Sequence, residues 1–253
     1  MTRRHAAEWW DLFAPDDDLE WHMELARRAG ARALDLGVGT ARLAIPIAAS
    51  GRTVVGIDDS LELLHIAHAK VSARGGGVVG RMRLLHGDVR DFALPREPPF
   101  DLVYSAEGVL NRCHDRADLA HALGCVRDVL RVGGTLAFTL VRVEAEDMDG
   151  RPRLEGVRPL GDGEEVQRHV AWTPGPKRGD VVVHTTYERF DRRGRSTERV
   201  HEREQIRVFE PVEVAEALQL GAFQDVERFC DHRGGRSAGH RDRLMVYRCH
   251  RGP

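Results

Sequence analysis

Short apolar runs alternate with helical patterns through residues 31–143, and this alternation constrains the fold more than any other feature of the sequence. Such an order is typical of β-α-β units, whose strands line up in a parallel sheet. The apolar runs predict strands at Ala31–Leu36, Thr53–Asp58, Met82–His86, Phe100–Ser105 and Thr135–Val143. The spacing of apolar residues between them predicts helices near residues 41–50, 60–73 and 117–131. This part of the chain is therefore predicted to form an α/β domain.

The pattern changes after residue 143. Prolines and glycines predict a loop over residues 150–163, and polar and apolar residues alternate beyond it. This alternation predicts an antiparallel meander with strands at Val166–Trp172, Val181–Phe190 and Ser196–Phe209. A helix from Pro211 to Leu220 follows, and then two closing strands at Val226–Cys230 and Leu244–Cys249. The predicted parts are an N-terminal helix with the α/β core at 1–149, a β-rich insertion at 150–209 and a closing segment at 210–253.

Composition excludes several classes of protein. With 42% hydrophobic residues and a net charge of −2, the chain has the content of a folded protein, and it lacks the basic excess of a nucleic-acid binder. No run of 18 apolar residues and no hydrophobic signal segment occur, so we expect a soluble, cytoplasmic protein without a membrane partner. The four cysteines form no C-x-x-C pair, and His65 and His68 have no third ligand in view, so no metal site is predicted.

The first predicted strand ends in an acid and runs directly into a glycine-containing turn, Asp35-Leu36-Gly37-Val38-Gly39-Thr40-Ala41-Arg42. Glycines in such a turn let the backbone approach a ligand closely, because no side chain intervenes. A nicotinamide-dinucleotide fingerprint would require a further glycine at position 42. Arg42 occupies that position, which disfavours a dehydrogenase.

Further landmarks follow in order at the ends of the later strands. Asp58 ends the second strand, 23 residues after Asp35, and the turn Gly87-Asp88-Val89 follows the third. The fourth strand ends at Ser105, and the segment Leu130–Leu136 carries a Gly-Gly turn before the fifth. Together these segments resemble the class I S-adenosylmethionine (SAM) methyltransferases, with Ala41 and Val132 at positions where that family usually has glycine and proline.

This resemblance implies a Rossmann-like α/β fold. Its seven-stranded sheet would have the order 3-2-1-4-5-7-6, with the last strand antiparallel and a small antiparallel β lid inserted at residues 150–209. The resemblance also implies SAM as the cofactor, with S-adenosylhomocysteine as its product. Asp35, Gly37 and Gly39 would face the methionine part of SAM, with Ser105 as a nearby main-chain contact. Asp58 would accept the ribose hydroxyls, and Asp88 and Val89 would meet the adenine.

Methyl transfer asks for few catalytic groups, because the sulfonium methyl of SAM is already activated, and alignment alone can suffice. Two candidates for a base, Glu107 and His114, lie in the loop after the fourth strand, and Glu107 is alternatively a residue that orders this loop. His201, in the insertion, is a third candidate.

The expected activity is transfer of a methyl group to an N or O nucleophile of a small metabolite, as in the antibiotic-pathway methyltransferases that the chain resembles. The sequence after Tyr104 lacks the N/D-P-P-Y motif, which disfavours amide and base-amine methylation. Three alternatives stay open: RNA or protein as the acceptor, drawing on the arginines at 189–207 and 232–243; a non-catalytic SAM-binding subunit; and pairing of the lid strands in a homodimer. The aromatic segment at residues 9–13 either closes over SAM or packs a first helix onto the core.

Overall fold

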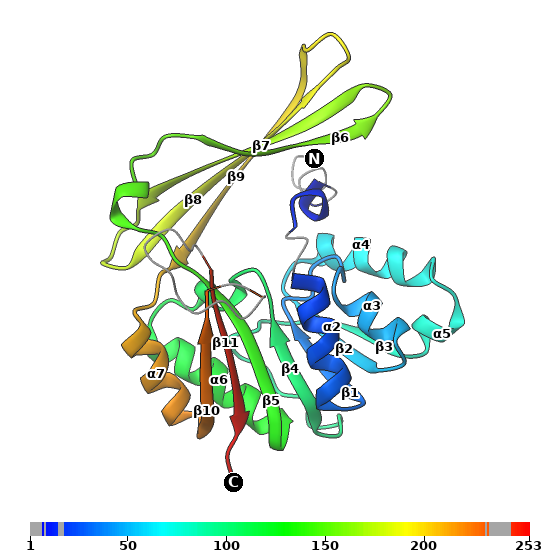
Figure 1. Ribbon diagram of the computed structural model, residues 1–253, viewed down its shortest axis with the longest axis vertical. Coiled ribbons are helices and arrows are strands. Elements are labelled where there is room, and N and C mark those ends of the chain that lie inside the picture. The colour runs from blue at the N-terminus through cyan, green and yellow to red at the C-terminus, as the bar shows by residue number, and fades with distance from the viewer. Residues whose placement is uncertain (1–6, 8, 15–17, 231, 233–243) are drawn as a thin grey trace. The chain divides into compact units, whose positions relative to one another are not determined.

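The computed structural model describes residues 7, 9–14, 18–230, 232 and 244–253, and the chain divides into two compact units (Figure 1). Residues 16–142 and 209–253 form the seven-stranded unit, and residues 1–15 and 143–208 form the four-stranded unit. The insertion predicted from the sequence therefore groups with the N-terminal residues, rather than with the segments that flank it in the sequence.

The seven-stranded unit is built on a mixed sheet with the strand order β3-β2-β1-β4-β5-β11-β10. Strand β11 runs antiparallel to both of its neighbours, and β1 to β5 are parallel. This arrangement confirms the predicted order 3-2-1-4-5-7-6 and the reversed last strand. The strands are β1 (Arg32–Leu36), β2 (Thr53–Asp58), β3 (Met82–His86), β4 (Phe100–Ser105), β5 (Leu130–Val141), β10 (Phe223–Phe229) and β11 (Leu244–Arg251).

Helices cover both faces of this sheet (Figure 1). One apolar cluster joins the sheet to α2 (Asp18–Ala29), α3 (Ala44–Ala49), α4 (Leu61–Ser72) and α5 (Gly76–Val79). A second cluster joins its other face to α6 (Arg116–Val129) and α7 (Pro211–Leu220). The described residues also form three short 3-10 turns: η1 (Asp11–Phe13), η2 (Val109–Arg112) and η3 (Ala145–Asp147). Among the described residues, no helix has the length and apolar character needed to cross a membrane.

The helices begin where local chemistry favours them. Ser60 accepts the Leu63 N–H at 3.3 Å as the predicted N-cap of α4, and Asp115 accepts the Asp118 N–H at 2.9 Å at the start of α6. Pro46 is the third residue of α3, where the amide that it lacks would have no partner within the helix. These caps set the helix starts close to the predicted positions.

The four-stranded unit contains an antiparallel meander of β6 (Arg153–Gly161), β7 (Glu164–Pro174), β8 (Asp180–Phe190) and β9 (Ser196–Arg207). The prediction of a loop over 150–163 is wrong, because β6 occupies most of it. Pro159 is tolerated there since β6 is an edge strand, which pairs only with β7 and can spare a backbone donor.

The aromatic segment at residues 9–13 belongs to the four-stranded unit. Trp9 joins Val166, Tyr187 and Val200 in a small apolar cluster, and Arg158 donates to the Leu12 carbonyl at 2.8 Å. Of the two interpretations of this segment, packing of a first helix onto the α/β core is wrong, and closure over SAM stays a prediction. Trp9, Leu12 and Phe13 thereby extend the apolar cluster of the meander.

Candidate functional site

The carboxyl ends of β1 and β2 are tied together by the turn that follows β1. Gly37 and Val38 both donate their N–H groups to the Ile57 carbonyl, at 2.8 and 3.0 Å. Gly39 donates to Asp58 Oδ2 at 2.8 Å, and Ser60 donates to Asp58 Oδ1 at 2.9 Å. Each carboxylate oxygen of Asp58 thus holds one backbone amide and keeps a further lone pair for another donor.

The two glycines of this turn have different tasks. Gly37 has φ +79°, and a Cβ built there would lie 2.4 Å from the Val109 side chain, so only glycine fits. Gly39 has φ +53°, but a Cβ there would meet nothing within 4 Å. Ala41 is also left-handed, with φ 63°, and occupies the position where the resembled family usually has a third glycine. The turn keeps the left-handed path of a glycine-rich loop and leaves the backbone at Gly39 open to approach.

Two carboxyl groups at this sheet edge are buried. Asp35 and Asp58 are each 3% exposed. Burial raises the pKa of Asp35 to about 7, against an opposing effect of the Tyr104 side chain. Burial also raises the pKa of Asp58, an effect that the amides of Ser60 and Gly39 partly offset. A desolvated acid of this kind is stabilised in its charged form by a nearby cation or by added hydrogen-bond donors.

Arg42 links α2, the turn and the loop after β4. Its guanidinium pairs with Asp18 through Nη1, at 2.7 Å, and through Nη2. The same Nη2 also lies 2.8 Å from Glu107 Oε1. Asp18 is 1% exposed. The two carboxylates outweigh the effect of burial and raise the pKa of Arg42, so its charge is secure. Glu107, a candidate base in the sequence, is therefore held in an ion pair with Arg42.

A second polar network surrounds Asp88. Arg90 donates to both carboxylate oxygens of Asp88, and these bonds lower the pKa of the acid. Its Nη1 lies 3.1 Å from both ring nitrogens of His114, whose Nδ1 is 3.1 Å from Asp118 Oδ2. The His114 side chain is 67% exposed. The structure thus brings His114 together with Asp88, and Val89, next to them in sequence, is buried.

Ser105 and Asn111 join neighbouring segments of the unit. The Ser105 hydroxyl donates to the Leu36 carbonyl at 3.0 Å, which ties β4 to β1. Asn111 is buried, and its amide pairs in both directions with the end of β5: Nδ2 donates to the Val141 carbonyl at 3.1 Å, and Oδ1 accepts the Val141 N–H at 2.7 Å. The side chain thereby replaces a strand neighbour at the last residue of β5.

His201 lies on β9, in the four-stranded unit, apart from the other candidates. Its Nδ1 lies 3.1 Å from the Thr186 hydroxyl, and its ring stacks on His184 with centroids 5.7 Å apart. Glu107 and His114 thus lie in two separate polar networks of the seven-stranded unit, and His201 lies on a strand of the four-stranded unit.

Sequence reasoning missed several residues of the seven-stranded unit. It treated Arg42 only as a misfit to a dinucleotide motif, and it did not single out Asp18, His22 or Tyr104. His22 is buried behind the site, its Nδ1 lies 2.7 Å from the Asp18 carbonyl, and burial lowers its pKa to about 4. The signal available for Asp18 was weak, because it is the last of three consecutive aspartates before an amphipathic helix.

Comparison with known proteins finds that the chain is similar to methyltransferases. Residues 33–134 match the family described as "Methyltransferase domain". A ubiquinone biosynthesis O-methyltransferase of Aromatoleum aromaticum is 31% identical over 144 residues, which are 54% of this chain and 58% of that protein. The chain matches its curated relatives over only 53% to 66% of their lengths.

Solved structures agree with the fold over nearly the whole chain. A SAM-dependent methyltransferase from Clostridium acetobutylicum superposes with a TM-score of 0.79 at 16% identity, covering 98% of this chain and 97% of that one. The sugar N-methyltransferase KedS8 from a Streptoalloteichus species has a TM-score of 0.71 at 22% identity and covers 94% and 88%. The fold is therefore that of the class I methyltransferases, including the inserted four-stranded sheet.

Proposed function

We propose that the chain is a SAM-dependent methyltransferase that transfers a methyl group to an N or O nucleophile of a small metabolite. The observation that carries the proposal is the arrangement at the β1 and β2 ends. There, Asp58 accepts the Gly39 N–H and can still accept a further hydrogen bond. A Cβ added at Gly39 would meet nothing within 4 Å, so the backbone there is open to a ligand. SAM would supply a sulfonium methyl group that is already activated for transfer.

The residues of this chain fit such a donor. Asp35, a buried acid with a pKa near 7, would gain from the positive charge of the methionine part, and the amides of Gly37 and Gly39 line the same turn. Asp58 would accept the ribose hydroxyls. Asp88 would accept the adenine amino group, held in place by Arg90, beside Val89. Ser105 would contribute its main chain.

For proton removal, the contacts separate the three candidates. Glu107 is paired with Arg42, so we propose that it positions the loop after β4. His114 contacts the Arg90–Asp88 pair, so we propose that it supports the adenine side of the site rather than the reacting methyl group. His201 belongs to the four-stranded unit, so it would take a proton only from an acceptor bound by that unit. Alignment without an essential base is therefore the proposed mode of catalysis.

We propose that the four-stranded unit selects the acceptor, because the chain enters it from β5 and returns from it to α7. Small-molecule acceptors are favoured over RNA, since many arginines of this unit are already paired with acids. Such pairs include Arg189–Glu164, Arg195–Asp191 and Arg199–Glu188. Arginines neutralised within the chain contribute little to phosphate binding.

Calorimetry with SAM and S-adenosylhomocysteine tests the proposal. Asp58→Asn should weaken binding about 10- to 100-fold, because it removes hydrogen bonds to a charged acceptor. Asp59→Asn is the matched control: the neighbouring carboxylate is 57% exposed, and its loss should change affinity by less than about threefold. Failure of the wild-type protein to bind either compound would overturn the proposal.

Labelled SAM and a panel of amino sugars, phenols and RNA would then identify the acceptor class. Methylation of RNA that declines steeply with salt would favour the nucleic-acid alternative. Binding of SAM without transfer to any acceptor would favour a non-catalytic subunit.

A further inference from the structure

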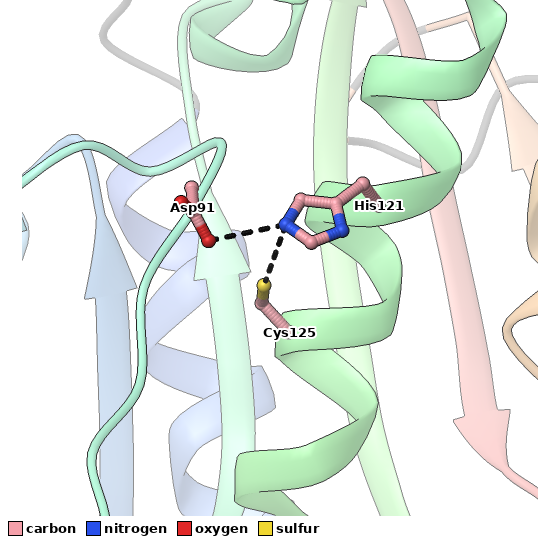
Figure 2. Close-up of side chains that lie close together, drawn as sticks. All are labelled: Asp91, His121 and Cys125. Carbon is pink, nitrogen blue, oxygen red and sulfur yellow. Dashed lines mark hydrogen bonds and ion pairs between the residues drawn. The ribbon is translucent and has the colours of Figure 1, made fainter.

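Three side chains of types that often ligate metal ions lie close together in the seven-stranded unit, outside the site described above. Asp91 lies in the loop after β3, and His121 and Cys125 lie one turn apart on α6 (Figure 2). Residues four apart on a helix share a face, so the two α6 side chains point the same way. No motif in the sequence predicts this group, since Asp91 and His121 are 30 residues apart.

The distances match those of a small tetrahedral centre. His121 Nε2 lies 3.1 Å from Asp91 Oδ1 and 3.8 Å from Cys125 Sγ, and the three ligand atoms all lie within 4.8 Å of one another. In a zinc site, bond lengths of about 2.0–2.3 Å place tetrahedral ligand atoms roughly 3.3–3.6 Å apart. Small side-chain rotations would therefore bring all three atoms onto one ion.

The same geometry argues against a proton relay. A Cys-His-Asp relay uses the two ring nitrogens separately, one toward the thiol and the other toward the acid. Here one nitrogen, Nε2, faces both Asp91 and Cys125 (Figure 2). Donor atoms that converge on a single point are the arrangement that a metal ion requires.

The donor set selects the kind of ion. A thiolate and an imidazole favour zinc over magnesium or calcium, which prefer oxygen ligands. Cys125 is half-buried, whereas the side chains of His121 and Asp91 are 60% and 82% exposed, so solvent reaches the group. Three protein ligands would leave the fourth position to water, and binding would release the thiol proton to solvent.

We propose that Asp91, His121 and Cys125 form a Zn²⁺ site that ties the loop after β3 to α6. Both sides are anchored. The Asp91 N–H donates to the Asp88 carbonyl at 3.3 Å, within the turn that Arg90 holds, and Asp115 caps α6. An ion at this place would fix a loop that also carries Asp88 and Val89.

Titration of the full-length, tag-free protein with Co²⁺ tests the site, because cobalt is a spectroscopic substitute for zinc in thiolate sites. We expect one equivalent to give a thiolate-to-cobalt charge-transfer band that Zn²⁺ abolishes by displacement. Cys125→Ser should lose the band, and His121→Gln should weaken binding at least about 100-fold, since even the loss of an outer partner of a ligand costs about 10- to 100-fold. Asp91→Asn should give an intermediate loss.

Matched controls use residues of the same types elsewhere. Cys230→Ser changes a half-buried cysteine, and His65→Gln changes an exposed helical histidine; both should keep the band. A band that survives in Cys125→Ser, or the absence of any stoichiometric band in the wild-type protein, would overturn the proposal.

A second measurement does not depend on the folding of a variant. In the wild-type protein, Zn²⁺ should slow alkylation of Cys125, measured by mass spectrometry, and leave the rate at Cys230 unchanged. Equal rates at Cys125 with Zn²⁺ and with a chelator would contradict the site.

One consequence rests on the proposed function: Zn²⁺ should tighten SAM binding by ordering the loop that carries Asp88. Failure of the chain to bind SAM would remove this consequence alone, because the cobalt band reports the metal site by itself. Loss of the band with SAM binding intact would remove the metal site alone.

Discussion

The carboxyl groups at the ends of β1 and β2 differ from those of the four-stranded unit in what surrounds them. In the seven-stranded unit, Asp35 and Asp58 are buried at strand ends, and burial raises their pKa values. In the four-stranded unit, bonds from backbone amides, a serine and arginines lower the pKa values of Asp149, Glu188 and Asp191. The same type of side chain is thus costly to ionise at these two strand ends and stabilised as an anion in the four-stranded unit, as it also is at Asp88.

This difference indicates where a ligand can do most. A carboxylate already satisfied by its own chain gains little from another partner, whereas a desolvated one gains from any cation or donor brought beside it. The paired carboxylates of the four-stranded unit stabilise its own structure, whereas the buried carboxyl groups at the ends of β1 and β2 would gain most from a bound ligand.

The largest expected effect comes from the buried ion pair of the seven-stranded unit. Arg42→Met should lower the free energy of unfolding by about 3–5 kcal/mol, because it leaves Asp18 buried without its guanidinium partner. Urea unfolding monitored by tryptophan fluorescence measures the loss. A loss no greater than that of the Arg199 variant described below would abolish the contrast between the units.

The next effect separates the two glycines of the turn after β1. Gly37→Ala should cost about 3 kcal/mol, since it combines a left-handed φ with a contact of 2.4 Å to Val109. Gly39→Ala is its control and should cost only about 1 kcal/mol, from backbone strain alone. If the proposed function holds, Gly39→Ala should lose SAM affinity while keeping most of its stability. Equal unfolding free energies for the two variants would contradict this division of tasks.

The third effect is a dependence on pH. Asp35 keeps its proton in the folded chain up to about pH 7 but loses it near pH 4 when unfolded, so its contribution to stability falls as pH rises between those values. Asp35→Asn removes this loss. The unfolding free energy of the variant relative to wild type should therefore rise by about 2–3 kcal/mol between pH 5 and pH 8.

Asp88→Asn is the control for this titration, because Arg90 lowers the pKa of Asp88. Its stabilising contribution is present above the ordinary pKa of an aspartate and is lost only at lower pH, so the difference from wild type should stay flat from pH 5 to pH 8. A flat difference for Asp35→Asn as well would show that burial does not set the charge of this site.

The smallest effect belongs to the four-stranded unit. Arg199→Met removes an arginine that is 65% exposed and pairs with Glu188 at 2.7 Å, and it should cost less than about 1 kcal/mol. The double variant with Glu188→Gln should show a coupling of similar size in urea unfolding. A loss of several kcal/mol would mean that this unit also depends on individual ion pairs.

Much of the fold could be predicted from the sequence, because its strands are short apolar runs with clear ends. The predicted bounds of β2, β3 and β4 agree with the structure, and β1 differs by one residue. An N-terminal helix was predicted without bounds, and the sequence did not place α2 at Asp18–Ala29, since its buried side is made partly of Asp18 and His22, which are not apolar. Strand β6 was missed because its proline and two glycines are typical of turns, and its edge position makes the proline acceptable.

The candidate site was less predictable. The Asp58–Gly39 contact follows from a known kind of turn, so the motif located both residues. The partners of Arg42 could not be found this way, because they lie 24 and 65 residues away and meet it only through packing. The roles assigned to Asp88, His114 and the other site residues stay predictions until binding is measured.

The amide of Asn111 has a consequence for how such chains diversify. By closing the hydrogen bonding of β5 at Val141, it completes the sheet immediately before the chain leaves for residues 143–208. A segment of different length or sequence could therefore follow at this boundary and leave the hydrogen bonds of β5 intact. If the proposed function holds, exchange of this segment between homologues should change the acceptor preference, and chimeras that switch sequence after Arg142 should fold more often than chimeras that switch within β5.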